Sequence, residues 1–137
     1  MKKVNYLMFV GVLLLSTSIL FSGCKKKSST PDYPTPVFIV SATTVQLQGG
    51  GDGVEFFTNC SSTDVKMTKV EILDPIHSGV VTYNLNGTYY LKGDIIALQA
   101  ANTAYTKEIG TYQFTFTGIR IADNAGFTIV TTLNVAK

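Results

Sequence analysis

The sequence predicts an all-β domain at residues 37–137, folded as an antiparallel β-sandwich of about seven strands. Composition is the first observation behind this prediction, because Gly, Thr, Val, Tyr and Phe dominate over good helix formers. Turn signals are the second, since they recur at the regular spacing of a sandwich. The third is the clean alternation of apolar and polar residues, which favours antiparallel sheets with one buried face over parallel sheets covered on both faces.

The strands follow from the apolar runs between the turn signals. A glycine-rich run at residues 49–53 separates the first two strands, and Asn86-Gly87 is the strongest hairpin signal because both residues accept positive φ. In the third strand the apolar positions change phase after Met67, which predicts a bulge or a bend. Residues 100–104 are ambiguous and could form a helical turn. The expected strands cover residues 37–47, 54–60, 65–73, 80–85, 88–91, 95–98, 111–117 and 127–135.

Residues 1–23 have the features of a lipoprotein signal peptide. A short basic start precedes an apolar run at residues 6–15, as in secretory signals. A membrane-spanning helix needs about 20 apolar residues, so the run is marginal for that alternative. The sequence Leu-Phe-Ser-Gly-Cys at residues 20–24 resembles the bacterial lipobox, in which small residues precede a cysteine that is acylated and becomes the N-terminus. We therefore expect cleavage before Cys24 and lipid on that residue; cleaved secretion without lipid is the other alternative.

Residues 24–36 are predicted to be the lipidated cysteine and a flexible linker. Three lysines follow the cysteine, and three prolines restrict the remainder to extended conformations. Extended at about 3 Å per residue, this segment would hold the domain roughly 35 Å from a lipid surface. Lys25, rather than Asp, follows the cysteine, and by resemblance to bacterial lipoproteins this implies an outer-membrane location, on either the periplasmic or the external face. The first expected partner is thus the membrane, bound through the N-terminal lipid.

Charge and side-chain chemistry exclude several classes of function. Without the signal peptide, nine basic residues face nine acidic ones, which leaves no basic surface for nucleic acid. Asp74, His77 and Ser78 lie close together in the sequence, but a short turn containing Pro and Gly does not easily supply the geometry of a catalytic triad. One histidine and one spare cysteine give no zinc spacing, and no calcium loop is present. We therefore expect no enzyme activity, no metal and no cofactor.

A short motif narrows the fold class. Residues 108–114, Glu-Ile-Gly-Thr-Tyr-Gln-Phe, resemble the immunoglobulin-superfamily segment acidic-x-Gly-x-Tyr-x-Cys. The resemblance implies that Tyr112 forms a tyrosine corner after Gly110, bonding to upstream backbone, with Phe114 in the place of the cysteine. The chain has no Trp, so the resemblance is to immunoglobulin-like folds broadly. Small lipoproteins of Bacteroides-like bacteria are similar in having a lipobox, a polar spacer and one immunoglobulin-like domain.

The tyrosines near the Asn86-Gly87 turn are the candidate ligand-binding residues. A two-residue turn would pair Tyr83 with Tyr90 on the inward face and direct Tyr89 to solvent. Tyr89 is the best single candidate, because an exposed aromatic ring gives contact area at low entropic cost. The alternative is that these tyrosines are core residues and ordinary cross-strand pairs. Cys60 lies on the apolar face of its strand and is expected to be a buried free thiol.

Two functional hypotheses follow from these observations. In the first, the domain is a non-catalytic binding or adhesion module that presents loops or a strand edge to an envelope protein or a glycan. In the second, the protein is a structural accessory subunit of an envelope complex, with no ligand of its own. The sequence predicts the location and the architecture, and it leaves the choice between these two hypotheses open.

Overall fold

The computed structural model describes residues 31–100 and 103–137, and these residues contain eight β-strands and no helix. The signal peptide, Cys24 and residues 25–30 lie outside the described residues. The β-rich unit runs from Tyr33 to Lys137. Its strands are β1 (Phe38–Gln46), β2 (Asp52–Cys60), β3 (Val65–Leu73), β4 (Val80–Tyr90), β5 (Ile96–Ala97), β6 (Tyr105–Thr106), β7 (Gly110–Arg120) and β8 (Gly126–Val135).

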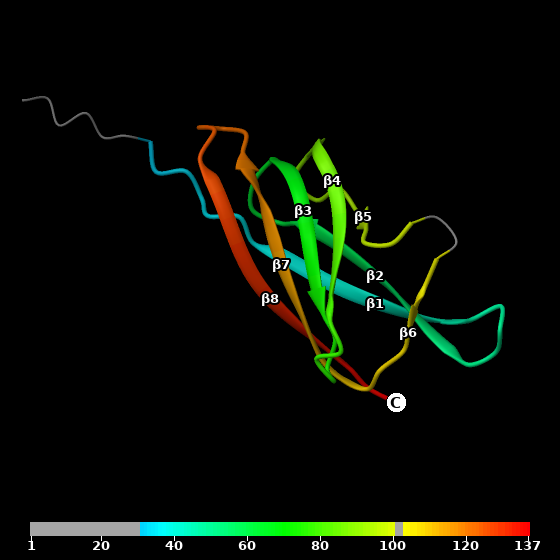
Figure 1. The fold of residues 1–137 in the computed structure, drawn as a ribbon. Coiled ribbons are helices and arrows are strands. Elements are labelled where there is room, and N and C mark those ends of the chain that lie inside the picture. Colours follow the sequence, from blue (N-terminus) through cyan, green and yellow to red (C-terminus); the bar gives the residue numbers. More distant parts are fainter. Residues whose placement is uncertain (1–30, 101–102) are drawn as a thin grey trace, which may run out of the picture. The chain divides into compact units, whose positions relative to one another are not determined.

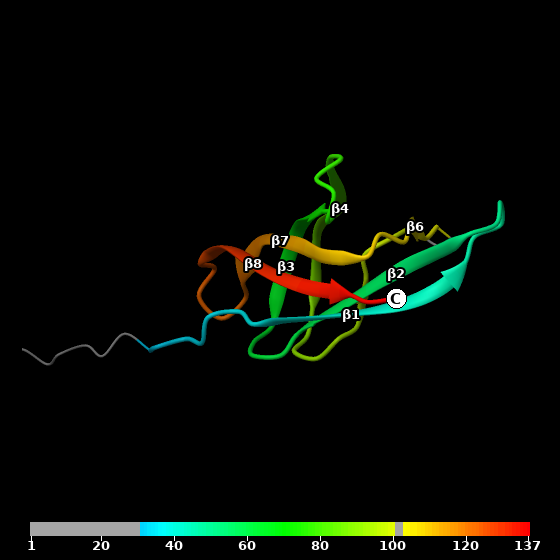
Figure 2. The ribbon, with the colours of Figure 1, turned by 90° about the horizontal axis from the view of Figure 1, so that it is seen from below.

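The strands form two antiparallel sheets (Figure 1 and Figure 2). Sheet A has the order β1-β2-β5, with β6 also paired to β2, and sheet B has the order β4-β3-β7-β8. Buried side chains from both sheets form one core, so the two sheets make a β-sandwich. Strand β4 is the edge strand of sheet B beside β3. The predicted fold class is therefore confirmed.

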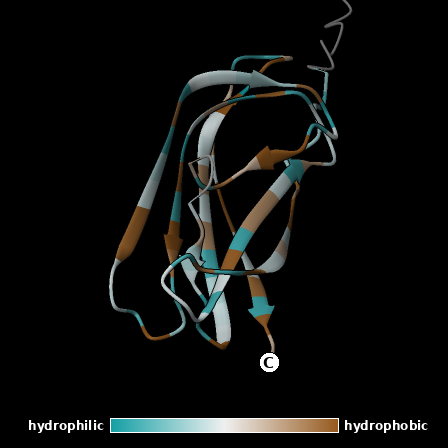
Figure 3. Ribbon diagram, turned by 90° about the vertical axis from the view of Figure 1, so that its right-hand side faces the viewer, coloured by the Kyte–Doolittle hydropathy of each residue, from teal (hydrophilic) through white to brown (hydrophobic). Residues whose placement is uncertain are grey.

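Aromatic side chains from both sheets fill the space between them. Phe38 of sheet A stacks on Phe116 of sheet B, with ring centroids 4.2 Å apart. Phe56 of sheet A meets the edge of Phe114 of sheet B at 5.1 Å. Burial of each such ring stabilises the fold by roughly 1.5–3 kcal/mol. Hydrophobic and hydrophilic residues alternate along the strands (Figure 3), so the inner faces hold the core.

The phase change in β3 is a β-bulge, as predicted. Met67 pairs with Gly118 and Lys69 pairs with Thr117, so Thr68 is an extra residue on β3. Both Met67 and Val70 are fully buried, although their separation of three would place them on opposite faces of a regular strand. The bulge therefore keeps both halves of β3 facing the core.

The predicted hairpin at Asn86-Gly87 is wrong. β4 is one continuous strand, whose pairing with β3 skips from Asn84, opposite Lys69, to Thr88, opposite Met67. Asn86 and Gly87 do have positive φ, 51° and 72°. They form a bulge instead of a chain reversal, because β3 continues on the same side and pairs with both halves of β4. A bulge with positive φ uses the same residue types as a tight turn, so the dipeptide alone does not distinguish them.

The interrupted strand opposite β2 also differs from the prediction. β5 has only two residues, and β6 was not predicted at all. Both pair with β2, β5 near its end and β6 near its start. Between them the Thr103 amide donates to the Ala100 carbonyl at 3.0 Å, while residues 101 and 102 lie outside the described residues.

Residues before the first strand contact the sandwich. The Arg120 guanidinium donates to the Tyr33 and Pro34 carbonyl oxygens, at 2.9 and 3.1 Å, and lies 5.8 Å from the Tyr33 ring. The Ser62 hydroxyl donates to the Thr35 carbonyl oxygen at 3.0 Å. Residues 33–35 of the predicted linker are thus bound to the sandwich. We call these contacts the tether clamp.

Candidate functional site

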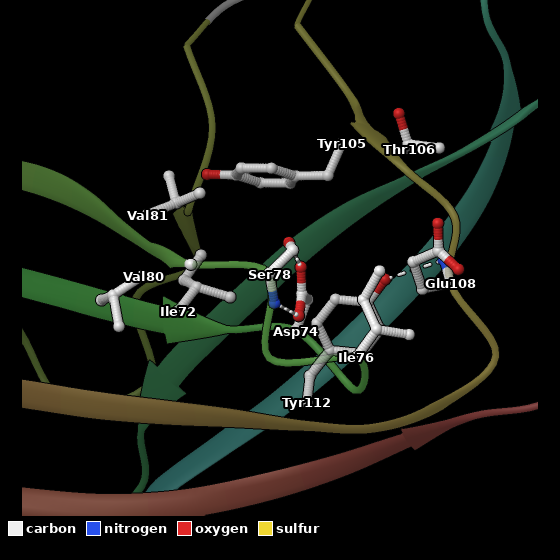
Figure 4. A pocket seen from close by; sticks show the side chains of 11 residues that line it. Ile72, Asp74, Ile76, Ser78, Val80, Val81, Tyr105, Thr106, Glu108 and Tyr112 are labelled. Atoms are coloured by element: carbon white, nitrogen blue, oxygen red, sulfur yellow. Dashed lines mark hydrogen bonds between the residues drawn. The ribbon is translucent and has the colours of Figure 1, made fainter.

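A cleft of about 390 Å³ opens between the turn at residues 74–79, the start of β4, and β6 (Figure 4). Apolar side chains line much of it, and polar groups from the turn and from the segment before β7 also reach it. Its volume falls within the range typical of small-ligand sites. The cleft joins three segments distant in sequence, and it was not predicted. The lining residues are Ile72, Asp74, Ile76, Ser78, Gly79, Val80, Val81, Tyr105, Thr106, Glu108 and Tyr112.

Asp74 closes the turn beside this cleft. Its carboxylate accepts hydrogen bonds from the Ser78 amide, at 2.9 Å, and from the Ser78 hydroxyl. These bonds, with a smaller effect of nearby His77, hold the pKa of Asp74 below its usual value, so this carboxylate is ionised at neutral pH. The Ser78 hydroxyl donates to Asp74, whereas in a catalytic triad the serine hydroxyl donates to a histidine that acts as its general base. The turn is therefore built as a side-chain-capped loop.

Tyr112 forms the corner that the motif implies. Its side chain is 2% exposed, and its hydroxyl oxygen accepts a hydrogen bond from the Glu108 amide at 2.9 Å. Burial raises the pKa of the Tyr112 hydroxyl, and the carboxylates of Glu108 and Asp74 raise it further. The phenol therefore remains protonated at neutral pH. The bond fixes the backbone of Glu108 at the end of the cleft.

The other two motif residues also have specific roles. Gly110 has a φ of 136°, and a Cβ there would lie 2.7 Å from Cβ of Pro75. A glycine is required on both grounds. Phe114 is fully buried and contacts the Phe56 ring in the core. The motif thus joins the corner to the core of the sandwich.

Tyr105 contributes an aromatic wall to the cleft, and the sequence prediction missed it. Its hydroxyl donates to the Leu98 carbonyl oxygen, and its ring lies 5.7 Å from the ring of Phe56. Burial raises the pKa of the Tyr105 hydroxyl. A two-residue strand is too short for an alternating pattern, so no periodicity marked this residue.

Tyr89 points to solvent, as predicted, from the outer face of sheet B. Its side chain is 63% exposed, and the Lys66 ammonium lies 5.0 Å from its ring centroid. Tyr83 and Tyr90 are half-buried and pack against the core. The predicted faces of these tyrosines are correct although the predicted turn is wrong. The bulge shifts the alternation of inward and outward side chains along β4 by one residue, as a hairpin turn at the same place would. The outer face of sheet B is rich in threonine: Thr82, Thr115, Thr117, Thr128 and Thr132.

An apolar groove crosses the outer face of sheet A. Ile39 and Ile95 are largely exposed, the latter at 76%, and Phe57 lies half-buried beside them. The buried Asn59 side-chain oxygen has no hydrogen-bond partner among the described residues. Sequence reasoning missed this groove, although a signal was present. Phe56 and Phe57 are adjacent in a strand, so one of the two has to face outward.

Cys60 is buried and unpaired, as predicted, with its sulfur 3.7 Å from the Ser62 hydroxyl oxygen. Within residues 31–100 and 103–137, no three His, Cys, Asp or Glu side chains gather as metal ligands would. The same residues include no helix of the length and hydrophobicity needed to cross a membrane. No protein-family model, curated protein or solved structure matches the chain.

Proposed function

We propose that the protein is a lipid-anchored component of the cell envelope whose sandwich domain is a non-catalytic binding or adhesion module for a protein or glycan. The anchor would be Cys24, at the end of the lipobox-like segment, and the membrane would be the outer membrane. The observation that carries the binding role is the exposed ring of Tyr89 on the outer face of sheet B.

The surroundings of Tyr89 favour binding over a purely structural role. The ring makes its contact with Lys66 on one side and remains largely open to solvent. An aromatic ring fixed on a sheet loses little conformational freedom when a ligand covers it. The threonine hydroxyls of the same face can donate and accept hydrogen bonds, as a glycan or a polar protein surface requires.

The test is capture by the mature lipidated protein in detergent, on a glycan array and from solubilised envelopes. Tyr89→Ala should abolish capture while the free energy of unfolding changes by less than about 0.5 kcal/mol, as is usual at an exposed position. Thr44→Ala, at an exposed position on β1 of sheet A, is the control and should retain capture. Capture by Tyr89→Ala at the wild-type level would overturn the role of this residue.

The apolar groove on sheet A supports a second candidate function, that of an accessory subunit in an envelope complex. Exposed apolar side chains gathered on one face are typical of protein–protein contacts. In the same capture experiment, Ile95→Ser would then lose a stoichiometric envelope protein that Tyr89→Ala retains. Loss of capture by Tyr89→Ala and retention by Ile95→Ser, together with a glycan-array signal, would favour the binding module.

A further inference from the structure

We propose that the cleft beside the turn at residues 74–79 binds a lysine or arginine side chain of a protein partner. This site is separate from the Tyr89 face, and either can fail without the other. The argument rests on three features of the cleft: exposed apolar walls, two carboxylates without a lysine or arginine in the lining, and a rigid corner that holds one of these carboxylates.

The apolar walls fit the aliphatic part of a long basic side chain. Ile76, Val80 and Val81 line the cleft and are exposed, Val80 at 58%. The Tyr105 ring points into the same space (Figure 4). Lysine and arginine bury their methylene groups along apolar surface while the charged end reaches a polar partner. A cation can also interact with the face of a tyrosine ring.

Two carboxylates give the cleft a negative charge. Asp74 and Glu108 both line it, so one cleft holds both acids. No Lys or Arg is among the described residues that line the cleft. Among the described residues, the Glu108 carboxylate makes no hydrogen bond or ion pair. A cation that enters would meet this charge beside low-dielectric walls, where the attraction exceeds that on an open surface.

The tyrosine corner makes the site rigid. The hydrogen bond from the Glu108 amide to Tyr112 fixes the backbone that carries the Glu108 carboxylate. Tyr112 is a positioning residue in this site, because it acts through Glu108. The turn with Asp74 is fixed in the same way by its bonds to Ser78. Pre-organised groups lose less entropy on binding, which favours a site over a merely charged surface.

The cleft lies at the end of the sandwich opposite the tether clamp. Arg120 pairs with Val65 at the start of β3, whereas Asp74 directly follows the end of β3. Nine residues of strand, at about 3.3 Å each, separate the two ends by roughly 30 Å. The cleft is therefore clear of the bound linker residues and open to a partner chain.

The experiment is a methyl NMR titration of the full mature lipidated protein in nanodiscs. The probes are the N-acetyl methylamides of lysine, arginine and norleucine, of which norleucine keeps the aliphatic chain and lacks the charge. We expect saturable shifts of the Val80 and Val81 methyl signals with the lysine or arginine probe. The dissociation constant of the norleucine probe should be about tenfold larger. Comparison of the two basic probes shows which cation fits better.

Glu108→Gln should weaken binding of the basic probes about tenfold. The matched control, Glu55→Gln, makes the same change on β2 outside the cleft and should bind like the wild type. Tyr112→Phe should weaken binding less than Glu108→Gln and should leave the preference for basic over neutral probes in place. Equal binding of norleucine and lysine, unchanged binding by Glu108→Gln, or no saturable shift with either basic probe would overturn the proposal. The Tyr89→Ala variant should titrate normally, which separates this result from the capture experiment.

Discussion

The hydroxyl oxygen of Tyr112 accepts a hydrogen bond from the backbone amide of Glu108, four residues earlier, at 2.9 Å. This bond closes the connection between β6 and β7, and thereby links sheet A to sheet B. It is also the local contact that the sequence motif at residues 108–114 implies. The stability of the sandwich and the shape of the cleft therefore depend on the same tyrosine.

Tyr112→Phe should lower the free energy of unfolding by about 1 kcal/mol, because it removes one hydrogen bond from a buried side chain and leaves the ring in place. Denaturant unfolding measures the change. Tyr89→Phe, which removes an exposed hydroxyl, is the control and should alter stability by less than about 0.5 kcal/mol. Equal effects of the two variants would show that the corner bond contributes nothing.

Cys24→Ser should leave an unprocessed precursor and abolish labelling with palmitate, because the sulfur of Cys24 is the expected site of acylation. Cys60→Ser is the control for loss of a thiol and should still be processed and labelled. Palmitate incorporation by Cys24→Ser would refute lipidation at this position.

Cys60 should resist thiol reagents in the folded protein and react rapidly after denaturation, because its side chain is 1% exposed. The rate of labelling with a maleimide at neutral pH measures this protection. Rapid labelling of the native protein would mean that the end of β2 opens far more readily than a buried thiol allows.

The turn beside the cleft should weaken in acid. The pKa of Asp74 is lowered by its hydrogen bonds to Ser78, so the folded state binds a proton at this group less readily than the unfolded state. Its contribution to stability is therefore fully present above the unfolded-state pKa, near 3.9, and is lost as the pH falls through the lower folded-state value. Asp74→Asn should flatten this part of the stability curve, measured by thermal unfolding between pH 2 and pH 7. An unchanged curve would assign the acid sensitivity to another group.

The sequence predicted the strands best where one strand has a long, patterned run. β3 covers the predicted residues, and its phase change marks a real bulge, because burial on one face constrains each residue of a long strand. Short sequence signals predicted the backbone conformation less well where pairing with a neighbouring strand selected it. The Asn86-Gly87 dipeptide allows a turn or a bulge, and the neighbouring strand β3 selected the bulge.

The candidate functional residues also differ in how far the sequence could predict them. The burial of Tyr112 could be predicted, because it depends on the position of the residue within one strand. The exposure of Tyr89 was predicted from a hairpin that does not form, and it holds because the bulge in β4 reverses the faces in the same way. The cleft could not be predicted, since it requires Asp74, Tyr105 and Glu108 to meet from separate segments. Of these, Tyr105 lies on a strand of only two residues that carries no pattern of its own.

The tether clamp has a consequence for the reach of the domain above a membrane. With Tyr33 bound to the sandwich by Arg120, only residues 25–32 remain between the proposed lipid and the domain, about 25 Å when extended instead of 35 Å. Tyr89 pairs with Lys66, which pairs on its other side with Ile119, the residue before Arg120. The Tyr89 ring therefore lies at the same end of the domain as the tether clamp. The cleft belongs to the far end. In an anchored molecule the Tyr89 ring would thus lie nearer the membrane than the cleft, by about the length of β3.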